Sequence, residues 1–143
     1  MKIFLMRHAE AETSEQVMKK DADRTLTEAG KLQVRVSANK LKEKLAEKDE
    51  SIDLVLTSPY VRACETAAIA ATVLGLDGKV IRERRLSPGA DVEKIKQLED
   101  EHRDAGNLLI VGHEPDLGII AGQLLRLNAS RPLGKAEVVE IAL

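Results

Sequence analysis

The N-terminal stretch Met1–Ala9, M-K-I-F-L-M-R-H-A, decides the fold of this chain. Its apolar run Ile3–Met6 predicts a strand that is buried on both faces, as strands of parallel sheets are. The run ends in Arg7 and His8, a fixed positive charge beside an imidazole. Open α/β sheets bind ligands at the carboxyl ends of their strands, so a site is expected here. Two residues alone are a weak signal, because Arg-His after a strand is also typical of a solvated loop.

The composition is that of an ordinary globular protein. The chain has 143 residues, 43% hydrophobic and 32% charged, which predicts one domain over residues 1–143. With one Phe, one Tyr and a net charge of −2, the chain lacks the features of a nucleic-acid binder. Its single cysteine fits a reducing compartment, and no apolar run is long enough to span a membrane. We therefore expect a cytoplasmic protein with no nucleic-acid or membrane partner.

Strand and helix patterns alternate along the rest of the chain. Apolar runs predict strands at 53–57, 80–81, 108–111 and 137–143, and the polar segment 10–23 is expected to be a loop. Helices are predicted after a Thr27 cap to about residue 48, after a Ser58 cap over 59–74, over 91–104, and from 115 to about 127. This alternation predicts a three-layer α/β/α sandwich with a largely parallel central sheet.

Three motifs follow three of the predicted strands. Arg7 and His8 follow the first strand, Arg62 lies just beyond the second, and His113 follows the strand at 108–111. If these strands are parallel neighbours, all three motifs meet at one edge of the sheet, together with two helix N-termini. Two arginines, two histidines and helix N-termini predict a pocket for a phosphoryl group, which arginine can bind through paired hydrogen bonds.

The chemistry expected in such a pocket is phosphoryl transfer. A neutral His8 can attack phosphorus to give a phosphohistidine intermediate, which water then hydrolyses. Arg7, Arg62 and His113 are expected to stabilise the charge on the phosphoryl oxygens. No cofactor is implied, and no metal is needed, because cationic side chains already neutralise that charge.

Rival sites find less support in the sequence. A cysteine phosphatase would need an arginine six residues after Cys64, and that residue is Ala70. The three histidines lack the helical spacing of a zinc site, so no metal is expected. Two features stay open, and they are the identity of any general acid and the role of the basic cluster at 82–85. The candidates for the acid are Glu114, Glu10 and Glu12, and the cluster consists of Arg82, Arg84 and Arg85.

Four motifs taken together resemble the histidine phosphatase superfamily. They are R-H-A at 7–9, R-T-L-T-E-A-G at 24–30, T-S-P-Y-V-R-A-C-E-T-A at 57–67 and V-G-H-E-P at 111–115. The L-S-P-G-A-D stretch at 86–91 and the short chain are most similar to the SixA-type phosphohistidine phosphatases. The one departure is Ala9, where the superfamily usually has glycine.

The resemblance implies a phosphoglycerate mutase-like fold and assigns roles to residues. His8 is then the nucleophile, Arg7, Arg62 and His113 complete the phosphate pocket, and Arg24 contacts substrate or lies at the rim. The expected substrate is phosphohistidine on a protein, such as a histidine phosphotransfer domain of a two-component relay. The alternatives are a phosphatase for small phosphomonoesters or sugar phosphates and, from another class, a non-catalytic phosphate- or phosphoprotein-binding domain.

Overall fold

The computed structural model describes residues 1–13, 15 and 17–143. Its strands are β1 (Lys2–Arg7), β2 (Leu54–Thr57), β3 (Val80–Arg82), β4 (Leu108–Gly112) and β5 (Val138–Ala142). Its helices are α1 (Glu28–Glu47), α2 (Val61–Leu74), α3 (Val92–Glu101) and α4 (Asp116–Leu124), with short 3₁₀ turns η1 (Asp21–Asp23), η2 (Arg84–Leu86) and η3 (Arg103–Ala105). The predicted α/β alternation is confirmed. Two residues of the predicted loop 10–23, Ser14 and Gln16, lie outside the described residues.

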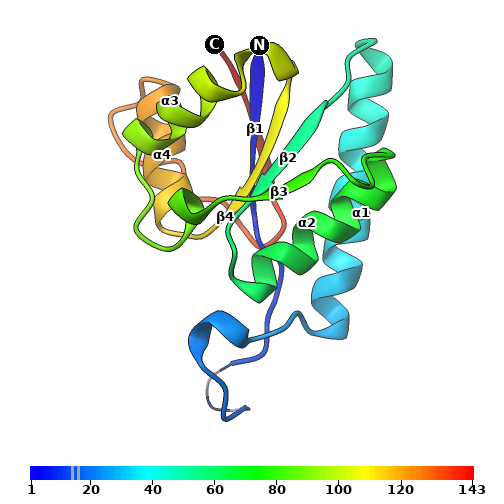
Figure 1. The fold of residues 1–143 in the computed structure, drawn as a ribbon, viewed down its shortest axis with the longest axis vertical. Coiled ribbons are helices and arrows are strands. Elements are labelled where there is room, and N and C mark those ends of the chain that lie inside the picture. Colours follow the sequence, from blue (N-terminus) through cyan, green and yellow to red (C-terminus); the bar gives the residue numbers. More distant parts are fainter. Residues whose placement is uncertain (14, 16) are drawn as a thin grey trace.

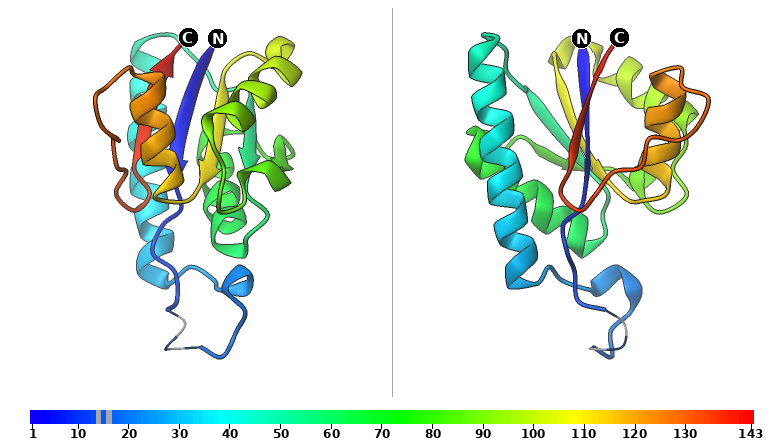
Figure 2. Two further views of the ribbon diagram at one scale, coloured as in Figure 1. Left: turned by 90° about the vertical axis from the view of Figure 1, so that its left-hand side faces the viewer. Right: turned by 180° about the vertical axis from the view of Figure 1, so that it is seen from behind.

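The strands form one sheet in the order β3-β2-β4-β1-β5. The pairs β1–β4, β4–β2 and β2–β3 are parallel, and β5 runs antiparallel to β1 along the sheet edge. Helices α1 and α2 cover one face of the sheet, whereas α3 and α4 cover the other (Figures 1 and 2). The predicted three-layer sandwich with a largely parallel sheet is therefore confirmed.

Both faces of β1 are buried, which explains its continuous apolar run. Phe4 and Met6 pack with α1 and α2, whereas Ile3 and Leu5 pack with the core under α3 and α4. Successive residues of a strand point to opposite faces, so a strand between two helical layers needs an apolar residue at every position. Among the described residues, no helix is both long and apolar enough to cross a lipid bilayer.

Several helix boundaries differ from the predictions. Helix α2 begins at Val61 rather than at position 59, and Ser58 is not its cap, because Tyr60 holds the N-cap position without a side-chain hydrogen bond. Helices α3 and α4 end three residues earlier than predicted, at Glu101 and Leu124. Helix ends depend on local capping that periodicity does not encode, which explains the differences.

The start of α1 holds the chain segment that follows the Arg7-His8 pair. Thr27 caps α1 as predicted, accepting a hydrogen bond of 3.0 Å from the backbone N–H of Gly30. The carbonyl oxygen of Glu10 accepts from the backbone N–H of Thr27 at 3.0 Å. A Cβ atom added at Gly30 would collide with that same Glu10 carbonyl oxygen. Close packing at Gly30 therefore brings α1 against the backbone just beyond His8.

We predict that Gly30→Ala lowers the free energy of unfolding by about 1–3 kcal/mol, because the added methyl group forces α1 away from Glu10. Denaturant unfolding measures this change. Gly134→Ala is the matched control, since the nearest atom to its Cβ would lie 3.7 Å away, an ordinary contact. Equal stability of the two variants would show that close packing at Gly30 is not required.

Candidate active site

The predicted residues meet in one cleft at the carboxyl edge of the parallel strands. His8 follows β1, His113 follows β4, and Arg62 lies in the first turn of α2, after β2. The cleft has a volume of about 370 Å³, and its lining includes Arg7, His8, Arg24, Arg62 and His113. The ring centroids of the two histidines are 5.3 Å apart. Parallel pairing of β2, β4 and β1 thus brings together side chains that are distant in the sequence.

The His8 ring is held by the backbone beside it. Its Nδ1 atom lies 2.7 Å from the carbonyl oxygen of Ala9. A carbonyl oxygen can only accept, so Nδ1 carries the proton of the neutral ring and Nε2 keeps its lone pair. The backbone N–H of Ala9 in turn donates to the hydroxyl of Thr66 in α2 at 3.2 Å. Ala9, whose carbonyl oxygen orients His8, is therefore itself held by α2.

Ser58 orients the second histidine, a role that the sequence analysis missed when it assigned Ser58 as a helix cap. The Oγ atom of Ser58 lies 2.8 Å from His113 Nε2 and accepts from the backbone N–H of Tyr60 at 3.2 Å. Ser58 is buried, and His113 Nε2 is the one acceptor that its hydroxyl has among the described residues. The serine hydroxyl therefore donates to Nε2, and Nδ1 of His113 carries the ring proton. The one available signal was that Ser58 ends a strand at the same sheet edge as His8 and His113.

Arg7 is fixed by the segment that leads into β5. One Nη1 hydrogen of Arg7 is donated to the carbonyl oxygen of Leu133 at 3.1 Å. The backbone N–H of Arg7 donates to the carbonyl oxygen of Glu137 at 3.1 Å, and the carbonyl of His8 accepts from Ala136 at 3.4 Å. Residues 133–137 therefore support both members of the Arg7-His8 pair.

Arg62 and Arg24 share a partner, Asp21, which the sequence analysis did not single out. The backbone carbonyl of Asp21 accepts from Arg62 Nη1 at 2.7 Å, and its Oδ2 accepts from Arg62 Nη2 at 3.2 Å. Its Oδ1 accepts from Arg24 Nε at 3.0 Å. Nothing in the sequence indicated these contacts, because Asp21 lies in a polar segment without periodicity. The 3₁₀ turn η1 places it beside the cleft, beyond the carboxyl edge of the sheet (Figure 1).

The cleft disfavours positive charge on both histidines. Burial lowers the pKa of His8 to about 4; the Ala9 hydrogen bond acts in the opposite direction, and the charges of Arg62, Arg7 and Arg24 lower the pKa further. Burial likewise lowers the pKa of His113 to about 3, and the charges of His8 and Arg62 act in the same direction. Both rings are therefore neutral at neutral pH, the form in which a histidine nitrogen can act as a nucleophile.

Three buried N–H groups of the cleft have no hydrogen-bond acceptor within the described part of the chain. They are Arg7 Nε, Arg62 Nε and His113 Nδ1. Buried donors are nearly always satisfied, so an unpaired set at one place indicates an acceptor supplied from outside the protein. An oxyanion carries acceptor oxygens and negative charge, and it fits these donors.

The three candidate acids occupy different places. Glu114 and Glu10 line the cleft, whereas Glu12 does not and instead pairs with Lys19 at 3.0 Å. Glu10 accepts from the Thr27 hydroxyl at 2.9 Å, while Glu114 Oε1 is buried without a partner among the described residues. Of the basic cluster, Arg85 forms ion pairs with Glu83 and Glu101, which indicates a structural role for its side chain.

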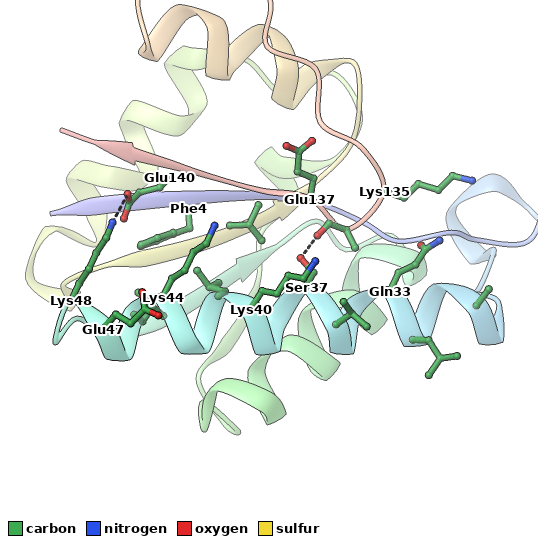
Figure 3. Close-up of a pocket in the computed structure, with 17 residues that line it drawn as sticks. Phe4, Gln33, Ser37, Lys40, Lys44, Glu47, Lys48, Lys135, Glu137 and Glu140 are labelled. Atoms are coloured by element: carbon green, nitrogen blue, oxygen red, sulfur yellow. Dashed lines mark hydrogen bonds and ion pairs between the residues drawn. The ribbon is translucent and has the colours of Figure 1, made fainter.

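A larger groove lies away from the histidines, between α1 and β5 (Figure 3). Its volume is about 1080 Å³, and its lining includes Lys40, Lys44 and Glu140 but neither His8 nor His113. The groove therefore lacks the phosphoryl-binding set, and the smaller cleft is the candidate active site. Within the described residues, no group of three metal-ligating side chains is found.

Comparison with known proteins places this site in a family. The model of the histidine phosphatase superfamily (branch 1) matches residues 3–88. The chain belongs to the histidine phosphatase superfamily. Similarity extends beyond residue 88, since a phosphohistidine phosphatase SixA homolog of Haemophilus influenzae is 34% identical over 129 residues, covering 87% of this chain and 77% of that protein.

Solved structures give the same placement. The structure of the protein histidine phosphatase SixA complexed with tungstate matches with a TM-score of 0.83 and 25% identity, covering 100% of this chain and 88% of that chain. A phosphoglycerate mutase from Bacillus anthracis str. Sterne shares the fold, with a TM-score of 0.75 and 15% identity over 97% of this chain and 86% of that one. The protein is thus a SixA-like member of the superfamily with a phosphoglycerate mutase-like fold.

We predict that both cleft histidines titrate well below the usual pKa of about 6.5. In a nuclear magnetic resonance titration of the imidazole signals, His8 should have a pKa of about 4 and His113 a pKa of about 3. Because the unfolded chain binds these protons first, each histidine should also reduce stability as the pH falls from about 6.5 toward its folded pKa. A pKa near 6.5 for either ring would contradict the buried, cationic environment.

We predict that Ser58→Ala lowers turnover about tenfold, because His113 Nε2 loses the partner that fixes its proton on Nδ1. Steady-state kinetics with any accepted phosphorylated substrate measure the change. Ser51→Ala is the control, since Ser51 is exposed and precedes β2 at the opposite edge of the sheet. Unchanged turnover in Ser58→Ala would show that His113 does not depend on this hydroxyl.

Proposed function

We propose that the chain is a metal-independent phosphohistidine phosphatase in which His8 is the nucleophile and a protein is the substrate. The observation that carries this proposal is the hydrogen bond between His8 Nδ1 and the Ala9 carbonyl, which leaves the Nε2 lone pair free in a cleft with Arg7, Arg62 and His113. The match to the Haemophilus influenzae phosphohistidine phosphatase SixA homolog supports the same function.

In the proposed reaction, His8 Nε2 attacks phosphorus and forms a P–N bond while the P–N bond of the substrate breaks. The electron pair of the broken bond stays on the departing imidazole, which leaves in neutral form once it is protonated. Water then attacks phosphohistidine-8, inorganic phosphate departs, and Nε2 recovers its lone pair. Arg7, Arg62 and His113 Nδ1–H stabilise the charge on the phosphoryl oxygens, and Arg24 contacts the phosphoryl group at the rim.

Two features favour phosphohistidine over a phosphate ester. An imidazole is a far better leaving group than an alkoxide once protonated, so this reaction depends less on a strong general acid. The connections β2–α2 and β4–α4 beside the cleft are only residues 58–60 and 113–115. Short connections at these two sides leave room for a histidine displayed on another protein, such as a phosphotransfer domain.

A small-molecule phosphomonoesterase is the second candidate. The observation that favours it is Glu114, which lines the cleft next to His113 and has a buried Oε1 atom with no partner in the described part of the structure. A carboxyl group in that position can protonate an alkoxide leaving group. The two candidates differ in their substrate and in their dependence on Glu114.

One experiment separates these functions. A phosphohistidine-bearing phosphotransfer protein and a panel of phosphomonoesters are each incubated with the wild type, His8→Ala and the control His102→Ala, and phosphate release is measured with chelator present. We expect release from phosphohistidine to exceed release from the esters, and to fall about 10³-fold or more in His8→Ala alone. His102 is the matched control because it lies at the end of α3, outside the cleft lining.

Other outcomes would redirect the assignment. Faster release from esters, together with its loss in Glu114→Gln, would indicate the phosphomonoesterase. Full activity in His8→Ala would exclude His8 as the nucleophile. Phosphate binding without turnover of any substrate would indicate a non-catalytic binding domain.

A further inference from the structure

Asp21 occupies an unusual position for a carboxylate. The cleft that we assign to a phosphoryl anion is lined by four cationic and three acidic side chains. The cationic side chains are those of Arg7, Arg24, Arg62 and Lys135, and the acidic ones are those of Glu10, Asp21 and Glu114. Among the described residues, Asp21 is the only carboxylate within ion-pair distance of a cleft arginine, and it pairs with two of them.

The contacts of Asp21 use only part of the hydrogen-bonding capacity of Arg62. A guanidinium has five N–H donors. Asp21 accepts one from Nη1 through its backbone carbonyl and one from Nη2 through Oδ2, while Nε–H is left without an acceptor. Asp21 therefore fixes the plane of the guanidinium and leaves donors for a second anion. This is the arrangement expected of a residue that positions an arginine.

The charge of Asp21 has a separate and opposite effect on an anion. Burial raises the pKa of its carboxyl group, but the hydrogen bonds and charges of Arg24 and Arg62 outweigh this and lower the pKa overall. The group is thus ionised at neutral pH. Because the Asp21 carboxylate already forms an ion pair with Arg62, its negative charge weakens the binding of another anion to the same arginine. In a phosphatase this penalty falls on substrate and on inorganic phosphate, the product.

We propose that Asp21 is a positioning residue for Arg62 whose negative charge also limits the affinity of the cleft for free phosphate and so speeds product release. This inference rests on the proposed function, because it takes phosphate to be the product. The side chain of Asp21 is 60% exposed and that of Arg62 only 6%. The carboxylate is therefore held at the rim of the cleft, where an arriving anion meets it.

Variants of the full chain separate the two effects. Asp21→Asn keeps the backbone carbonyl and an amide oxygen for Arg62 but removes the charge, whereas Asp21→Glu keeps the charge. Asp23→Asn is the matched control, because Asp23 belongs to the same 3₁₀ turn η1, is exposed, and has no side-chain contact recorded with the described residues. Asp21→Asn and Asp23→Asn change the net charge equally. Thermal unfolding checks that all three variants are folded.

The measurement is calorimetric titration with inorganic phosphate and with tungstate at fixed pH and ionic strength. We expect Asp21→Asn to bind both anions about tenfold more tightly, the size expected when one partly solvated like charge is removed. Asp21→Glu and Asp23→Asn should stay within about twofold of the wild type. In steady-state kinetics, Asp21→Asn should lower kcat and KM together and strengthen product inhibition by phosphate.

Three results would overturn the inference. Equal or weaker anion binding in Asp21→Asn would leave Asp21 with a structural role only. Equal tightening in Asp23→Asn would show an effect of net charge rather than of position. Tightening in Asp21→Glu would show that the effect does not come from removing the charge. Failure of the proposed function gives a different result, namely no turnover by the wild type. The affinities of the variants for tungstate can still be compared in that case.

Discussion

Parallel pairing between β1 and β4 is the constraint on which the site depends. The register places Arg7 opposite Gly112, and the backbone N–H of His8 donates to the Gly112 carbonyl at 3.0 Å. Backbone hydrogen bonds therefore fix the positions of the residues that follow the two strands, which are His8 after β1 and His113 after β4. On the other side of β4, the backbone N–H of Ser58 donates to the Val111 carbonyl at 3.0 Å, so the end of β2 is held against β4 in the same way. Ladder bonds are short and directional, which gives the two rings a fixed separation.

The electrostatics of the cleft follow from burying cations beside neutral rings. Arg62 is buried, and such a charge is tolerated only where partners replace its lost hydration. Asp21 supplies part of that replacement. Burial keeps both histidines unprotonated, and the arginine charges act in the same direction. In the proposed reaction, the cations that would bind an oxyanion thus also help to keep His8 in its neutral form.

Much of the fold could be predicted from sequence because it rests on long-range patterns. Apolar strand runs fixed the layers, and parallel topology placed Arg7, His8, Arg62 and His113 at one edge. The role of Ser58 could not be predicted, since a serine before proline at a strand end reads equally well as a helix cap. Asp21 was missed for a different reason. Its position depends on a turn in a segment with neither helix nor strand periodicity, and such local geometry leaves no repeating signal.

The antiparallel edge strand has a consequence for how the protein is made. Arg7 and His8 are synthesised well before the residues that support them, which are Leu133, Ala136 and Glu137. Leu133, for example, follows Arg7 by 126 residues. A nascent chain that lacks residues 133–142 has β1 and β4 but cannot complete the surroundings of His8. The surroundings of the Arg7-His8 pair are thus complete only after β5 has been synthesised and has paired with β1.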